Sequence, residues 1–97
     1  MSVIVESSVF PRDKGGSVSA FVARAVKRIR ESGLPHKLGS MGTCIEGEWT
    51  GVMEVVERCF QEVRKDCDRI YLSLKADYRK GPSGRLENKV RSPEKKL

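Results

Sequence analysis

The side chains best suited to chemistry in this sequence are carboxylates placed near aromatic rings. Glu46 and Glu48 come just before Trp49, and Asp77 ends an alternating segment that contains Tyr71. Carboxylates beside aromatic rings suit a cationic heterocycle, through charge pairing and cation–π contact. The same pattern also fits polar side chains that are solvated or pair across a sheet face used for oligomerisation.

Recognisable catalytic and metal-binding motifs are missing from the sequence. It contains no GxxxxGK[ST], GxGxxG, HExxH or GxSxG. A nucleophile–base pair would depend on the single histidine, His36, which directly follows Pro35. Cys44, Cys59 and Cys67 form no CxxC pair, so reduced buried thiols are expected rather than a metal site. We therefore expect a protein that is not an enzyme and has no cofactor and no metal.

The net charge of +6 comes almost entirely from the end of the chain. Residues 79–97 hold seven basic and two acidic side chains, a charge of +5, which leaves +1 for residues 1–78. A basic segment of this kind is typical of a solvated tail, and the alternative is a nucleic-acid binder that uses it. The body lacks the aromatic pattern of an RNA-binding sheet, which makes nucleic acid the weaker hypothesis.

Length and composition indicate one small domain that spans residues 1–97. The chain is 38% hydrophobic and 33% charged, and no apolar run approaches a membrane span. The N-terminus has no basic region and carries Glu6, unlike a secretory signal. We expect a cytoplasmic protein whose thin core is supplemented by pairing with other copies.

The first half of the chain predicts a strand, a helix and a hairpin. Residues 3–10 are rich in β-branched residues, and an apolar stripe of period three to four runs through residues 18–29. Ser17 is placed to cap this helix and Gly33 to end it. Residues 36–41 and 43–49 read as two short strands joined through Gly42.

The second half predicts another helix and the clearest strand. Thr50 would cap a helix whose apolar stripe runs from Val52 to Cys67, and from Arg69 the period changes to two. A short final helix around Leu86 and Val90 is expected before Pro93.

The order β-α-β-β-α-β predicts an α+β, ferredoxin-like sandwich: a four-stranded antiparallel sheet with two helices on one face, followed by a short C-terminal helix or tail. Alternation assigns residues to the two sheet faces. The core-facing residues are expected to be Val3, Val5, Val9, Ile45, Ile70, Leu72 and Leu74. The open face should carry Ile4, Glu6, Ser8, Phe10, Cys44, Glu46, Glu48, Tyr71, Ser73, Lys75 and Asp77.

Three segments resemble a known family. They are residues 17–19 (SVS), the hairpin MGTCIEG at residues 41–47, and the strand end KADYR at residues 75–79. Together they look like the thiamine-binding protein family related to YkoF, over nearly the whole chain. The resemblance implies the ferredoxin-like fold, a homodimer or homotetramer assembled through the sheets, and a non-enzymatic protein that binds thiamine or a hydroxymethylpyrimidine precursor. Pro93 departs from the terminal helix seen in such relatives.

The resemblance also implies roles for five residues. Ser19 and Thr43 would serve the pyrimidine edge, Glu46 would accept from its exocyclic amine, Trp49 would stack on it, and Asp77 would balance charge. Each has a structural alternative: Ser19 as a helix-start hydroxyl, Thr43 as a turn residue, and Trp49 as a core or interface anchor. A ligand-free structural or regulatory oligomer of the same fold is the second hypothesis for the whole chain.

Overall fold

The computed structural model describes residues 2–80, apart from the side chain of Ser17. It contains β1 (Ser2–Pro11), the short 3₁₀ turn η1 (Gly15–Ser17), α1 (Val18–Ser32), β2 (His36–Leu38), β3 (Thr43–Gly47), α2 (Trp49–Arg64) and β4 (Ile70–Arg79). This order confirms the predicted βαββαβ succession. The final helix expected around Leu86 and Val90 lies outside the described residues.

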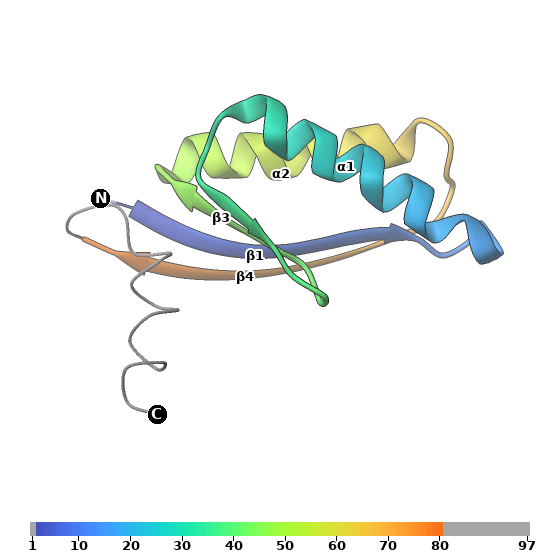
Figure 1. Ribbon diagram of the computed structural model, residues 1–97, viewed down its shortest axis with the longest axis horizontal. Helices are drawn as coiled ribbons and strands as arrows, with labels where there is room; N and C mark the ends of the chain where they lie inside the picture. Colours follow the sequence, from blue (N-terminus) through green and yellow to red (C-terminus); the bar gives the residue numbers. More distant parts are fainter. Residues whose placement is uncertain (1, 81–97) are drawn as a thin grey trace.

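The four strands form one antiparallel sheet in the order β2-β3-β1-β4. α1 and α2 lie on the same side of this sheet, and no helix of residues 2–80 covers the other side, which is called the helix-free face below (Figure 1). The α+β, ferredoxin-like arrangement predicted from the element order is therefore confirmed. Neither helix among residues 2–80 is long and apolar enough to cross a membrane.

The hydrophobic core fills the space between the helices and the two central strands. Its fully buried strand residues are Val3, Val5 and Ile45, each 0% exposed. Ala25 and Ile29 reach it from α1, and α2 contributes the stripe Val52, Val55, Val56, Cys59 and Val63. These core residues recur at spacings of three to four in the helices and of two in β1, as the sequence pattern predicted.

Leu72 and Leu74 are on the predicted face but are not part of the core. The register places them opposite Val9 and Ser7, on the helix side of the sheet. They are nevertheless 41% and 42% exposed. The prediction that they are buried is wrong because β4 is an outer strand and α2 packs mainly on β1.

The predicted end of α1 is confirmed, and the predicted N-cap of α2 is not. α1 ends before Gly33, whose φ of +74° suits glycine and stops the helix as predicted. α2 begins at Trp49, with Glu48 in an extended conformation as its N-cap residue. The Glu48 carbonyl accepts the first helical hydrogen bond from the Val52 N–H at 2.9 Å. Thr50 therefore lies inside the helix, and the prediction that it caps the helix is wrong.

Arg24 fastens α1 to the C-terminal half of α2. Its guanidinium lies 3.2 Å from a Glu62 carboxylate oxygen and 2.8 Å from an Asp66 carboxylate oxygen. It also donates to the Glu62 carbonyl oxygen at 3.2 Å and stacks over the Phe21 ring. This cluster fixes how the two helices sit over the sheet.

Candidate functional site

A row of four side chains crosses the helix side of the sheet from edge to edge. Leu38 pairs with Thr43, Thr43 with Ser7, and Ser7 with Leu74. The two central members are hydroxyl residues in an otherwise apolar surface, and they are only 7% (Ser7) and 4% (Thr43) exposed. Buried hydroxyls normally have a hydrogen-bond partner, so these two positions need an explanation.

The two hydroxyl residues line a cavity of about 330 Å³ between α1 and the sheet. Its walls come from the end of β1, from α1, from Cys59 of α2, and from the turn between β2 and β3. The lining residues on α1 are Val18, Val22, Ala25, Val26 and Ile29. Within the described chain neither the Ser7 nor the Thr43 side chain makes a hydrogen bond. Both hydroxyl oxygens keep some accessible surface. Both are thus available to a guest.

The turn of residues 39–42 is held tightly against the end of β1 beside this cavity. The Gly39 N–H donates to the Gly42 carbonyl oxygen at 2.8 Å, which closes the turn. Gly42 has a φ of +155°, and a Cβ there would lie 3.0 Å from the Ser7 carbonyl oxygen. Only glycine allows this approach, so the cavity wall depends on the residue that joins the two strands.

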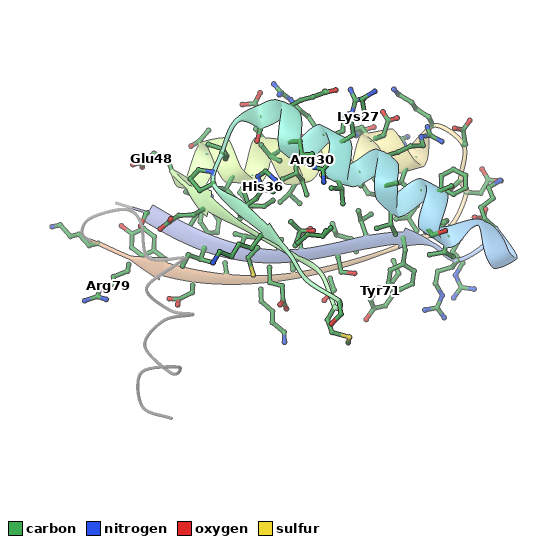
Figure 2. All side chains as sticks on the ribbon, in the orientation of Figure 1. Lys27, Arg30, His36, Glu48, Tyr71 and Arg79 are labelled. Atoms are coloured by element: carbon green, nitrogen blue, oxygen red, sulfur yellow. The ribbon has the colours of Figure 1, made fainter. Side chains whose placement is uncertain are left out.

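An open groove lies next to the cavity, along α1 and beside Leu38 of β2. It is lined by Ser19, Val22, Ala23, Val26, Lys27, Arg30 and Leu38. Three of these residues, Val22, Val26 and Leu38, also line the cavity, so the two hollows are neighbours that share these side chains as a border. Figure 2 shows Lys27 and Arg30 on the helix layer.

The opposite face of the sheet is mixed in charge. One row across it is Lys37, Cys44, Glu6 and Lys75, and the next is Glu46, Ile4 and Asp77. The register also brings Arg79 to this face, so the strands contribute three carboxylates (Glu6, Glu46, Asp77) and three cations (Lys37, Lys75, Arg79) to it. Phe10 and Tyr71 stack there with ring centroids 5.4 Å apart, and Arg12 lies over the Tyr71 ring. Tyr71 and Arg79 point away from the helices (Figure 2).

The five predicted site residues do not converge on one place. Thr43 lines the cavity and Ser19 lines the neighbouring groove. Glu46 and Asp77 flank Ile4 on the opposite face of the sheet, where Glu46 is 2% exposed. Trp49 opens α2 and is half exposed. Thr43 and Glu46 are separated by three positions of one strand, and an odd spacing puts two residues on opposite faces.

The sequence interpretation missed Ser7, Lys27 and Arg30. The signal for Ser7 was present, since it interrupts the inward-facing run Val3, Val5, Ser7, Val9 with a hydroxyl. Lys27 does not belong to the apolar stripe of residues 18–29, and nothing in the helical period marks a groove beside it. That groove exists only because the β2 edge, with Leu38, comes up beside α1.

The thiols are shielded rather than activated. Burial raises the pKa of Cys59, which lines the cavity, to about 11. Burial, and secondarily the charge of Glu6, also raises the pKa of Cys44. Neither thiol is a ready nucleophile, because the thiolate is the reactive form. In the described part of the chain no three His, Cys, Asp or Glu residues gather as a metal site would need.

Comparison with known proteins agrees with this architecture. Residues 5–94 match the family model described as thiamine-binding protein. The chain belongs to this thiamine-binding protein family. The resemblance inferred from the MGTCIEG hairpin is thereby confirmed.

Relatives in the thiamine-binding protein family match over almost their full lengths. The UPF0045 protein Mb1933 of Mycobacterium bovis is 38% identical over 98 residues, covering 100% of this chain and 96% of the relative. The crystal structure of the hypothetical protein MJ1052 from Methanocaldococcus jannaschii has a TM-score of 0.88 at 31% identity, covering 96% of each chain. A putative thiamine biosynthesis/salvage protein from Thermotoga maritima has a TM-score of 0.85 at 27% identity, covering 96% of this chain and 99% of its own.

Proposed function

We propose that this protein binds thiamine or a hydroxymethylpyrimidine precursor without transforming it. The observation that carries the proposal is the cavity of about 330 Å³, with two unpaired hydroxyls, in a member of the thiamine-binding family. Sites for small molecules typically begin at about 300 Å³ and combine apolar walls with a few polar groups. A single pyrimidine ring fits a cavity at the small end of that range.

The cavity chemistry suits the aminopyrimidine ring. Its flat faces are apolar and would pack against Val22 and Val26 of α1. Its edge carries ring nitrogens and an amino group, and the Ser7 and Thr43 hydroxyls each donate one hydrogen bond and accept others. Hydroxyls that have no protein partner in a mostly apolar cavity are poorly satisfied, so a ligand that pairs them gains binding free energy.

Binding rather than catalysis is also favoured by what surrounds the cavity. Cys59 is the one titratable residue among those that line it, and its pKa of about 11 keeps it a neutral thiol. General acid–base catalysis needs a group whose pKa lies near the working pH. The lining thus provides contacts and orientation for a ring but no proton transfer at neutral pH.

Isothermal titration calorimetry with thiamine and with hydroxymethylpyrimidine tests the proposal. Thr43→Val and Ser7→Ala each remove one hydroxyl from the cavity, and each should weaken binding about 3- to 10-fold. Ser73→Ala, which removes a half-buried hydroxyl from the opposite face, should leave the affinity unchanged. Absence of heat with both compounds, or equal affinities in all four proteins, would rule the cavity out as the site.

The roles predicted for Glu46 and Asp77 require a ligand on the other side of the sheet. Both carboxylates lie beside Ile4 there, and neither borders the cavity. Glu46→Ala decides between the two faces. Weaker thiamine binding in this variant would place the ligand on the helix-free face, and unchanged binding would reject the predicted role of Glu46.

We also propose that the protein works as a homo-oligomer built through its sheet. β4 is an outer strand of ten residues, and it exposes apolar side chains on both of its faces. Tyr71 is 51% exposed on the helix-free face, and Leu72 and Leu74 are exposed on the other. A second copy that covers this strand would bury the surface that the chain's own helices leave open.

We place this function in the cytoplasm. All three cysteines carry free thiols, and Cys59 and Cys67 are buried, which fits a reducing compartment. Cell fractionation with an antibody against the protein tests this, and recovery from a secreted fraction would contradict it.

A further inference from the structure

We propose that the preferred ligand is phosphorylated: the phosphate monoester of the hydroxymethylpyrimidine, with its ring in the cavity and its phosphate between Lys27 and Arg30. This inference rests on the proposed function and narrows it from a class of pyrimidine compounds to an anionic member of that class.

The first step is that the cavity and the groove share a border. Val22, Val26 and Leu38 line both the cavity and the groove. Val22, Val26 and Arg30 are spaced by four residues, so they form one stripe along α1 that advances about 6 Å with each step of four residues. A ring held beside Val22 and Val26 therefore has its substituent one turn from the Arg30 side chain.

The second step is the charge of the cavity itself. Its lining contains hydroxyl, glycine and apolar residues and no acidic or basic side chain. The thiazolium of thiamine is a permanent cation, and it finds no carboxylate there to offset the loss of its hydration. An uncharged pyrimidine ring loses little on entering the same space.

The third step is the pair of cations at the groove. On α1, Arg24 is paired with Glu62 and Asp66, and Arg28 with Glu31. Lys27 and Arg30 make no ion pair with any described residue, although they lie on the same helix. Two unpaired cations three positions apart share one helix face. An arginine fork beside a lysine is a common arrangement for holding a phosphate.

Calorimetry at low ionic strength tests the inference with three probes: the hydroxymethylpyrimidine alcohol, its phosphate monoester, and inorganic phosphate. In the wild-type protein the ester should bind at least about 10-fold more tightly than the alcohol, and inorganic phosphate far more weakly than the ester. In the double variant Lys27→Gln/Arg30→Gln the affinity for the ester should fall to the affinity for the alcohol. The affinity for the alcohol should stay as it is in the wild-type protein. The advantage of the ester should shrink in high salt because the two cations are exposed.

The control is Lys37→Gln/Lys75→Gln, which removes the same charge from the opposite face of the sheet. It should keep the full preference for the ester, which separates local contact from a change in net charge. If the alcohol binds and the ester binds no more tightly, this inference fails and the proposed function stands. If inorganic phosphate binds as tightly as the ester, the ring is irrelevant and the inference also fails. If neither pyrimidine compound nor thiamine binds, both proposals fall.

Discussion

Single residues at the β2–β3 turn control how closely the cavity wall approaches β1. Gly42 is the critical one, since its backbone runs within contact of the Ser7 carbonyl and its φ is positive. The turn requires glycine at this position because a larger residue would be strained and would contact β1.

Gly42→Ala should therefore destabilise the protein by about 1–3 kcal/mol, through strain at its φ and the clash with β1. Gly51→Ala is the matched control, because a Cβ at that position of α2 meets nothing within 4 Å. There alanine should stabilise by up to about 1 kcal/mol, since it restricts the unfolded chain. Urea denaturation of the two variants measures both effects, and equal unfolding midpoints would contradict the close approach.

The thiols offer a second test at this scale. In native protein Cys44, which is half-buried, should react with a thiol reagent before Cys59 and Cys67. With a pKa of about 11, Cys59 has roughly one thiolate per thousand molecules at pH 8. Mass spectrometry of partially labelled protein gives the order, and Cys44→Ser should abolish the early phase. Native labelling of Cys59 as fast as in urea would contradict its burial.

Among the secondary-structure elements, the two helices are coupled by charge as well as by packing. Arg24 of α1 meets Glu62 and Asp66 near the end of α2, and Lys65 adds a further contact to Glu62 at 2.8 Å. The hydrogen bonds from Lys65 and then from Arg24 lower the pKa of Glu62 below its ordinary value of 4.5. A carboxyl whose pKa is lower in the folded state stabilises that state above the unfolded pKa.

Stability should accordingly fall as the pH drops through 4.5 and continue to fall until Glu62 is protonated in the folded state. Urea midpoints measured from about pH 6 to about pH 3 follow this loss. Glu62→Gln should reduce both the stability at neutral pH and its dependence on pH in that window. Glu54→Gln, which breaks only an exposed pair with Arg58, should change neither by much. Identical pH profiles for Glu62→Gln and wild type would refute the coupling.

The sequence predicted the single helices and strands better than it predicted the contacts between them. Periodicity located both helices and the long strands, because burial of one face leaves a direct mark on residue spacing. Alternation also assigned Ile4, Phe10 and Tyr71 to the helix-free face correctly. The exposure of Leu72 and Leu74 was not predictable, since it depends on how far α2 reaches across the sheet. The groove beside Lys27 likewise depends on where a different strand, β2, lies.

At the scale of the whole molecule, the helices cover the centre of the sheet and leave its β4 side open. Tyr71, Leu72 and Leu74 remain exposed there on an otherwise well-formed strand. A long, uncovered outer strand of this kind favours association in solution.

Light scattering should consequently show a species larger than the monomer for the wild-type protein. Tyr71→Lys/Leu74→Lys should shift it towards monomer, because each lysine places a charge in the buried contact. Leu38→Lys is the control, an exposed leucine on the opposite edge of the sheet, and should leave the mass unchanged. A wild-type protein that is monomeric in solution would contradict the oligomer proposal.

The two edges of the sheet are unequal, since β2 has three residues and β4 has ten. A partner strand at β2 would find only a short ladder of free backbone groups, whereas β4 offers a long one. Copies joined edge to edge through β4 would pair this strand with its counterpart in a two-fold arrangement, which uses up the long edge of the sheet that residues 2–80 form. Assembly by this route would end at a dimer. The short β2 edges that remain would disfavour further strand pairing into fibrils.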